Sequence, residues 1–408
     1  MQRLLRLELH WQVLMAMLLG VAFALTFGQV SWIDGLAEIF LRLLRMIIVP
    51  LIFTSIVHGV AGIGGGSHLG RLGLKTLLYY SLSSFLAICV GLILANTLRP
   101  GAGVTDFGNT EFSPEDLEAP ASLAETLIRL VPLNPVAAAA NFDILGLIFF
   151  SLCLGAALSG MSGAQGDRMR SFFDGLFELV LRLTLMVIKL LPIGVFALIA
   201  RAVSSLGLGV AAQVGKWILT LSLGLAIHLF VVLPLVFFLL TRKNPFAHYR
   251  AVGSAMAMAF STSSSAATLP VSLTAVRDRA GVSDRVSSFV LPMGATVNMD
   301  GTALFECAGA LFIAQALGFE LSLPAQLAMV LTAFLASVGA AAVPSAGLVM
   351  IFIVLEAIGL TDPRAYALVG LMLGVDRPLD MMRTTVNVTS DTVGAAIIAH
   401  SEGEELNY

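Results

Sequence analysis

Apolar runs of about 20 residues recur along this 408-residue chain and constrain its fold more than any other feature. They lie near residues 11–28, 36–61, 76–97, 136–160, 171–203 and 212–240. A helix of that length crosses the hydrocarbon core of a bilayer, whereas a spanning barrel needs strands of strict polar and apolar alternation, which these runs lack. The sequence therefore predicts an all-α, multi-pass membrane protein in contact with the lipid bilayer.

Composition supports this prediction and excludes several classes of protein. Hydrophobic residues make up 58% of the chain and charged residues 12%, roughly half of the 25% typical of soluble domains. The net charge of -3 indicates no basic surface for nucleic acid. Cys89, Cys153 and Cys307 lie inside apolar runs without CxxC spacing, so neither a disulfide framework nor a cysteine metal site is indicated.

Basic residues in the loops indicate how the chain is oriented. They fall on the side shared with the amino terminus, at Arg71, Lys75, Arg168, Arg170, Arg242, Lys243 and Arg250. By the positive-inside rule that side is cytoplasmic. We expect a protein of the cell inner (cytoplasmic) membrane with both termini in the cytoplasm, and the acidic loop at Thr105–Pro120 outside.

After Arg250 the pattern of simple spans ends. Ala259–Leu273 and Ala336–Met350 consist of small residues around a proline, with arms too short to span, which predicts two re-entrant helical hairpins. An apolar segment that carries acids follows each hairpin, so hairpin and charged helix form an internal repeat. Interrupted segments in corresponding positions of two halves indicate a transporter binding site near the midplane of the bilayer.

One face of the last predicted helix carries six polar side chains. They are Asp376, Asp380, Arg383, Thr384, Asn387 and Asp391. Exposed to lipid, Asp380, Arg383 and Asp391 would cost on the order of 8 to 10 kcal/mol, so this face must look inward. A buried structural ion pair is the alternative to a site. The acids outnumber the arginine, and the spare negative charge favours a site for cations, protons or an ammonium group.

Within the apolar segment that follows the first hairpin, the stretch "NMDGT", Asn298–Thr302, predicts an unwound turn. Its short polar side chains and Gly301 are weak helix formers. Freed carbonyls, the Asn298 amide and the carboxylate of Asp300 or Asp391 would form an all-oxygen cage suited to sodium. A simple kink at Gly301 is the alternative.

Glu306 follows Thr302 by one helical turn and has no cation-binding group around it in sequence. Burial favours the uncharged form of an isolated carboxyl group. We therefore expect Glu306 to carry a proton, with a permanently neutral glutamic acid as the alternative.

Five motifs give the chain a family resemblance. They are "STSSSAATLP", "GATVNMDGTALFE", "SVGAAAVPSAG", "DMMRTTVNVTSD" and "YYSLSS" at Tyr79–Ser84. With these motifs the whole chain resembles the dicarboxylate/amino acid:cation symporters, which include archaeal aspartate transporters and animal excitatory amino acid transporters. The resemblance implies eight transmembrane helices, two re-entrant hairpins, inverted repeats, an elevator mechanism and a homotrimer.

The resemblance also divides the chain into parts. Residues 1–70 would be scaffold spans 1 and 2, residues 71–104 span 3 of the transport domain, residues 105–205 an external loop with scaffold spans 4 and 5, and residues 206–402 the rest of the transport domain. The implied function is symport of glutamate or aspartate with sodium, protons or both, which is not an enzymatic activity.

Positions that match the family's motifs supply an expected site. Asp380 would bind the substrate amino group, and Arg383 with Thr302 the side-chain carboxylate. Ser264, Ser265, Thr384 and Asn387 would meet the main-chain carboxylate, and Val343 and Gly347 would close the site. The resemblance also implies three sodium sites. The first would use Gly294, Asn298, Asn387 and Asp391. The second would use Thr296, Met299, Ser337, Val338 and Ala340, and the third would use Tyr80, Ser83, Ser84, Asn298 and Asp300. Glu306 matches the proton-carrying glutamate of the animal transporters.

The chain departs from the family at one charge. Archaeal members have an arginine at the position of Ser263 and animal members one at Met381, and Arg377 is the nearby residue able to replace it. Three other functions remain as alternatives. A C4-dicarboxylate symporter would leave Asp380 without a partner, an intramembrane aspartyl protease would need a proton shared between two aspartates, and a passive channel would show no exchange-stimulated uptake.

Overall fold

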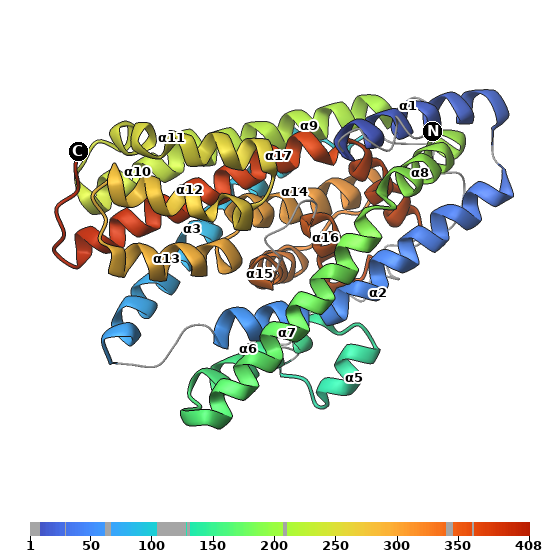
Figure 1. Ribbon diagram of the computed structural model, residues 1–408. Coiled ribbons are helices and arrows are strands. Elements are labelled where there is room, and N and C mark those ends of the chain that lie inside the picture. Colours follow the sequence, from blue (N-terminus) through green and yellow to red (C-terminus); the bar gives the residue numbers. More distant parts are fainter. Residues whose placement is uncertain are drawn as a thin grey trace.

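The computed structural model describes residues 9–28, 30–61, 67–103, 128, 131–206, 210–339, 346–360 and 363–408. Helices and their connections make up all of these described residues, with no strand among them (Figure 1). The helices are α1 (Leu9–Phe27), α2 (Ser31–Ala61), α3 (Ser67–Leu98), α5 (Pro135–Ala140), α6 (Ile144–Ser159), α7 (Gly163–Ile188), α8 (Leu191–Leu206), α9 (Val210–Ile227), the π-helix η3 (His228–Val232), α10 (Leu233–Thr241), α11 (Pro245–Thr262), α12 (Ser265–Asp278), α13 (Asp284–Val297), α14 (Asp300–Ala316), α15 (Leu323–Gly339), α16 (Ala346–Ala357) and α17 (Pro363–Ser401). The prediction of an all-α chain is confirmed for the described residues.

Several helices are long and apolar enough to cross a bilayer. Within the described residues these are the segments Ser31–Ala61, Arg71–Leu98 and Gln213–Thr241, and the bent pair α7 and α8 would make a fourth span. Shorter apolar helices cover Trp11–Phe27 and Gly146–Ser159. These helices agree with a chain that lies in a membrane.

Two runs predicted as ordinary spans are interrupted, so that prediction was wrong for them. The helix axis bends by 51° between α7 and α8, where Pro192 has no N–H to offer the carbonyl of Ile188. The run at 136–160 divides into α5 and α6 because the side chain of Asp143 accepts the N–H of Gly146 at 3.2 Å and starts a new helix.

The first predicted hairpin is present as α11 and α12, which pack against each other. Ser263 ends α11 with a left-handed φ of 52°, and Ser264 starts α12 by accepting the N–H of Ala267. Pro270, the central proline of the predicted hairpin, lies inside α12 and does not form the turn. In the second hairpin α15 and α16 pack together, and the tip, with Val343 and Ala340, lies outside the described residues.

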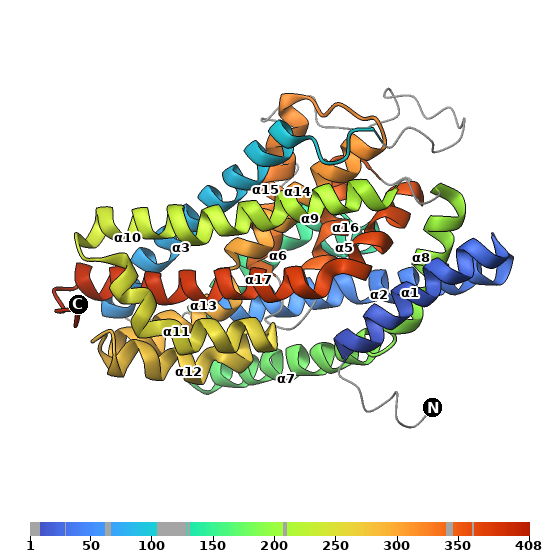
Figure 2. The ribbon, with the colours of Figure 1, turned by 90° about the horizontal axis from the view of Figure 1, so that it is seen from above.

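Helix α17 runs between α9 and α10 on one side and α11, α12 and α13 on the other (Figure 2). On another flank, α2 packs against α6, α7 and α8, and α1 packs against α8 (Figure 1). From Arg383 to Ala399 every residue of α17 is buried. Helices surround α17 on all sides there, so any polar group on it needs a partner inside the protein.

Beyond the end of α17, Glu402 joins three segments through ion pairs. Its carboxylate lies 2.6 Å from Arg71 Nη2, 2.6 Å from Lys75 Nζ and 3.6 Å from Arg285 Nη2. The side chain is only 4% exposed. Hydrogen bonds from Lys75 and Arg71 lower the pKa of Glu402 from 4.5 to about 2. Glu402 therefore stabilises the folded state above the unfolded-state pKa, and this contribution is lost as the pH falls toward 2.

We expect Glu402→Gln to lower the Tm at neutral pH, because Lys75 and Arg71 lose their shared carboxylate. The deficit should shrink as the pH falls from about 4.5 to about 2, where the native Glu402 also becomes protonated. Thermal unfolding in detergent across this range measures it. Glu320→Gln is the matched control, since Glu320 is 88% exposed and lies 3.4 Å from Arg99. A deficit of equal size at pH 7 and pH 2 would contradict the assignment.

Candidate functional site

The predicted break in the helix after residue 297 is present but shorter than expected. Asn298 is extended, with φ −104° and ψ 93°, and Met299 follows with φ −123° and ψ 61°. Asp300, Gly301 and Thr302 already belong to α14, so their predicted unwinding was wrong. The break places the N-terminus of α14, where the first N–H groups of a helix have no partner within the helix, in the interior of the protein.

Gly301 is needed for close packing rather than for flexibility. A Cβ atom there would come within 2.6 Å of the carbonyl oxygen and 2.9 Å of the Cα of Arg383. Its N–H donates to Asn387 Oδ1 at 2.7 Å, and Asn387 Nδ2 donates to Thr302 Oγ1 at 3.3 Å. The first turn of α14 therefore lies directly on α17.

The six polar residues on one face of α17 are all buried, as predicted. Each is at most 6% exposed: Asp376, Asp380, Arg383, Thr384, Asn387 and Asp391. On the opposite face Leu379 and Val386 are each 1% exposed, whereas Val375 and Met382 are half-buried. This part of α17 is an internal helix that carries charge.

Arg383 is held on one side and unpaired on the other. Its Nη2 donates to Asp376 Oδ1 at 2.7 Å and to Asp380 Oδ1 at 2.8 Å, and the guanidinium lies 4.0 Å from the centre of the Phe305 ring. Within the described residues, Nε and Nη1 have no hydrogen-bond partner although they are buried. The unpaired Nη1 can donate to a carboxylate, whereas the Nε–H lies on the opposite edge of the guanidinium group and would need a different acceptor.

The structure places Gly347 and Thr302 beside Arg383 and the predicted serines at the start of α12. A Cβ on Gly347 of α16 would come 3.1 Å from Arg383 Nη1 and 3.0 Å from Thr302 Cγ2, so the second hairpin lies against the guanidinium. Ser264 caps α12, Ser265 is buried, and α12 packs on α17. The second arginine near Asp380 is Arg377, whose Nη1 lies 3.9 Å from Asp380 Oδ2 and whose side chain is 26% exposed.

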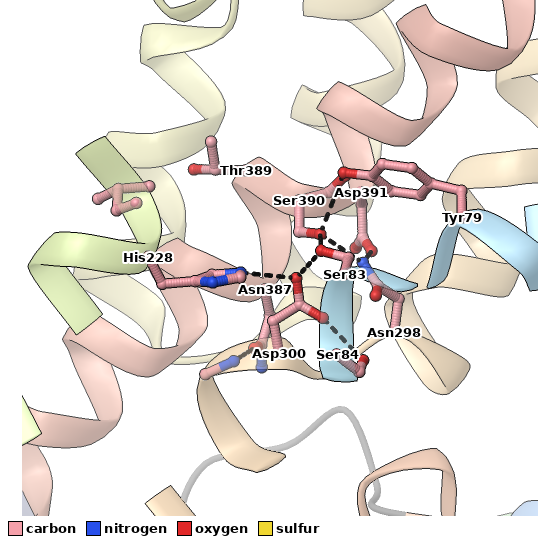
Figure 3. Close-up of polar contacts among 12 residues, drawn as sticks. Tyr79, Ser83, Ser84, His228, Asn298, Asp300, Asn387, Thr389, Ser390 and Asp391 are labelled. Atoms are coloured by element: carbon pink, nitrogen blue, oxygen red, sulfur yellow. Dashed lines mark hydrogen bonds and ion pairs between the residues drawn. The ribbon is translucent and has the colours of Figure 1, made fainter. Parts of the chain in front are cut away.

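Asp300, the first residue of α14, accepts hydrogen bonds from two other helices. Ser83 of α3 donates to its Oδ2 and Ser84 to its Oδ1, the latter at 2.7 Å. His228 of η3 lies on the other side, with Nε2 3.1 Å from Oδ2 (Figure 3). Of the predicted third sodium set, Ser83, Ser84 and Asp300 are thus in direct contact.

Hydrogen bonds extend this cluster to Asp391. Asn298 Nδ2 donates to Asp391 Oδ1 at 2.9 Å and to Ser390 Oγ at 3.0 Å, and Ser390 Oγ also lies 3.0 Å from Ser83 Oγ. Tyr79 Oη donates to the carbonyl oxygen of Ser390 at 3.2 Å (Figure 3). Two buried acids therefore belong to one polar network.

Three observations fit this network to sodium. Asn298 Oδ1 is buried and has no hydrogen-bond partner among the described residues, so its lone pairs are available. A Cβ on Gly294 would collide with Asp391 Oδ1 and Tyr80 Oη, so the bare Cα of this glycine leaves space between oxygens. The donor set of carboxylate, amide and hydroxyl oxygens suits a hard cation.

Some predicted sodium ligands make other contacts. Asn387 Oδ1 accepts the Gly301 N–H, and Tyr80 Oη donates to the carbonyl oxygen of Val290 at 2.8 Å. Thr296 bonds Met293 in its own helix and lines a cavity of 340 Å³ beside His58. Ser337 bonds Phe334 in its own helix; Met299 is buried in the break, Val338 is half-buried, and Ala340 lies outside the described residues. No hydrogen bond among the described residues joins the members of this second predicted sodium site to one another.

Glu306 lies one turn deeper in α14 than Thr302 and is completely buried. Within the described part of the chain, neither of its carboxyl oxygens has a hydrogen-bond partner. A charged carboxylate in such surroundings would be very costly, so the neutral acid is the form that fits.

Sequence reasoning missed three residues of this network. Ser390 and Tyr79 lie beside predicted residues, at Asp391 and Tyr80, and helical spacing alone could not tell which neighbour turns inward. His228 had a clearer signal, since it is an ionisable residue near the middle of an apolar span, which marks a functional position by default.

Comparisons with known proteins agree with this geometry. The family model described as "Sodium:dicarboxylate symporter family" matches residues 9–401. Excitatory amino acid transporter 1 of Ambystoma tigrinum is 34% identical over 443 residues, covering 94% of this chain and 80% of that protein. Excitatory amino acid transporter 4 of Rattus norvegicus is 33% identical, covering 96% and 82%. Neutral amino acid transporter A of Homo sapiens is 35% identical, covering 91% and 76%. With a match along nearly its whole length and relatives of this identity, the chain belongs to the sodium:dicarboxylate symporter family.

Proposed function

We propose that this protein is a secondary active symporter that takes up acidic amino acids, glutamate or aspartate, together with sodium, protons or both. The chain is a transporter and not an enzyme, as the family shows. The observation that carries the substrate is Arg383, which is buried, anchored by two aspartates, and left with Nε and Nη1 unpaired. A substrate carboxylate would accept from Nη1.

The relatives leave the charge of the substrate open, because excitatory and neutral amino acid transporters match at nearly the same identity. Arg383 favours an acidic side chain, since a neutral substrate would leave its donors unpaired in a buried site. Asp380 would take the amino group. Ser264, Ser265, Thr384 and Asn387 would meet the main-chain carboxylate, Thr302 would reach the side-chain carboxylate, and Val343 and Gly347 would close the site.

Sodium coupling follows from the family, and we place the ions on this chain's oxygens. Ser83, Ser84 and Asp300 would hold one sodium with Tyr80 and Asn298. Asp391, Asn298, Asn387 and Gly294 would hold a second; Thr296, Met299, Ser337, Val338 and Ala340 would hold a third once the second hairpin brings them together. Glu306 would carry the proton.

We further propose the family's architecture for this chain, with eight transmembrane helices, two hairpins, inverted repeats and an elevator movement within a homotrimer. The packing of α2 on α6, α7 and α8 supports a scaffold formed by residues 1–70 and 105–205. The packing of α3 on α14 and of α17 on α9 to α14 supports a transport domain formed by residues 71–104 and 206–402. Both termini would lie in the cytoplasm, with the protein in the inner membrane.

The alternatives fit the geometry less well. A protease dyad must share a proton between its two aspartates, whereas Asp376 and Asp380 each accept a hydrogen bond from Arg383. A C4-dicarboxylate lacks the amino group that Asp380 would bind.

Uptake into liposomes tests the proposed function directly. Purified protein should accumulate labelled aspartate or glutamate under an inward sodium gradient or pH gradient and should show exchange-stimulated uptake. Labelled succinate under the same gradients separates the dicarboxylate alternative, and loss of exchange stimulation separates a channel. No uptake of any of the three, under either gradient, would refute the proposal.

Arg383→Lys keeps the charge beside Asp376 and Asp380 but removes the Nη1 donors. We expect the KM for the acidic substrate to rise by about 10- to 100-fold, because charge-assisted hydrogen bonds to its carboxylate are lost. The kcat should change much less. Arg201→Lys is the control, since Arg201 pairs with Asp34 at 3.5 Å in another part of the molecule. An unchanged KM would show that Arg383 does not bind the carboxylate.

Glu306→Gln tests the proton carrier, since glutamine has nearly the same shape and cannot exchange a proton. Uptake driven by a pH gradient alone should be lost, while uptake driven by sodium should remain. Measurement of initial uptake rates at several external pH values checks this. The same pH dependence in variant and native protein would mean that Glu306 is only a neutral structural acid.

A further inference from the structure

His228 is a completely buried ionisable side chain near the middle of a predominantly apolar span, and the substrate and proton sites do not use it. Its Nε2 lies 3.1 Å from Asp300 Oδ2, which makes it the third donor to that carboxylate beside Ser83 and Ser84. Its Nδ1 is buried without a hydrogen-bond partner in the described part of the protein. An unpaired buried nitrogen is unfavourable, so stability alone does not explain a histidine here.

The local backbone is unusual at the same place. The π-helix η3 separates α9 from α10, and the N–H of Leu233 donates to the carbonyl oxygen of His228, five residues earlier. In a regular α-helix that N–H would bond Leu229 instead. Such single π-turns are rare and are frequent at functional sites.

The π-turn leaves one carbonyl to be satisfied from outside. Leu229 has lost Leu233 as its donor, and Pro234, the next residue along, has no N–H. Tyr249 of α11 supplies the missing donor, with Oη 2.5 Å from the carbonyl oxygen of Leu229. Tyr249 is itself only 8% exposed. The first hairpin therefore fixes the turn that carries His228.

We infer that His228 is a positioning residue of the Asp300 cation site, aimed by the π-turn that Pro234 and Tyr249 maintain. The Nε2–H donates to Asp300 Oδ2 and fixes the plane of the carboxylate. Ser83, Ser84 and His228 use three of its roughly four acceptor positions, which leaves one on Oδ1 for a cation. This inference rests on the proposed sodium site.

Sodium binding without substrate gives the test. The Tm of the purified protein is measured against NaCl concentration, with choline chloride holding the ionic strength constant. His228→Leu should raise the half-stabilising sodium concentration by about tenfold or more, because a donor to a charged group is lost. The Tm in choline chloride alone reports separately on any loss of stability.

Two conservative variants distinguish positioning from packing. The amide nitrogen of glutamine reaches about as far as Nε2 of histidine, whereas that of asparagine reaches only as far as Nδ1. His228→Gln should therefore retain sodium stabilisation within about threefold of the native protein, and His228→Asn should resemble His228→Leu. Equal behaviour of the Gln and Asn variants would overturn the inference.

The π-turn is tested at a distance by Tyr249→Phe, which removes only the hydroxyl on Leu229. We expect the half-stabilising sodium concentration to rise by about threefold. His248→Gln is the matched control, because His248 is also completely buried but contacts Tyr408 at 2.5 Å and Thr392 at 3.2 Å instead of Asp300. It should leave the sodium dependence unchanged.

The outcomes separate this inference from the function on which it rests. Sodium stabilisation in the native protein that persists unchanged in His228→Leu and Tyr249→Phe would overturn the role of His228 alone. An equal shift of the half-stabilising sodium concentration in His248→Gln would show that the effect of His228 is one of general packing. No sodium effect in the native protein would overturn the cation site itself, and this inference with it.

Discussion

The contact between the first turn of α14 and α17 determines most of the site. Gly301 has no Cβ, and its Cα approaches the backbone of Arg383 so closely that any side chain would collide with it. Its N–H then binds Asn387, so the two helices are joined by a hydrogen bond as well as by packing. Arg383, Asn387 and Asp391 lie along the α17 side of this contact, and Asn298, Asp300 and Thr302 along the α14 side. A wider separation between α14 and α17 would move these two sets of residues apart.

Buried charge is the second constraint, and it is met locally. Asp376 and Asp380 on α17 neutralise Arg383 from the same helix, so the arginine is oriented before any substrate arrives. The Phe305 ring supports its flat face. Preorganised donors of this kind bind a carboxylate without first paying to order a long side chain. Arg377 adds a second, partly exposed positive charge beside Asp380, which makes this end of the site less negative than three acids and one arginine would suggest.

Features that depend on the spacing of residues along a helix were predictable from the sequence, whereas features that depend on contacts with other helices were not. Six polar residues at helical intervals had to share a face, and the cost of exposing them to lipid had to turn it inward. The break at Asn298 was also predictable from its weak helix formers, but not its length, because the Gly301 contact with α17 keeps Asp300–Thr302 helical. Pro192 and Asp143 are residue types that interrupt helices. Both lie in apolar runs, so the apolar pattern alone did not predict these interruptions. The π-turn was beyond prediction, since it needs Tyr249 from another helix.

The residues proposed to bind the cation and the substrate are linked through a very short stretch of chain. Asn298 holds Asp391, Asp300 holds Ser83, Ser84 and His228, and Gly301 holds Asn387, all within four consecutive positions. Because Met299 to Gly301 leads directly from the break into a rigid helix, Asp300 cannot move without moving the N–H that binds Asn387. The same Asn387 bonds Thr302 beside Arg383. Coupling between the proposed sodium and substrate sites would therefore need no long pathway, because both would share one helix N-terminus and would differ only in which atoms of it they use.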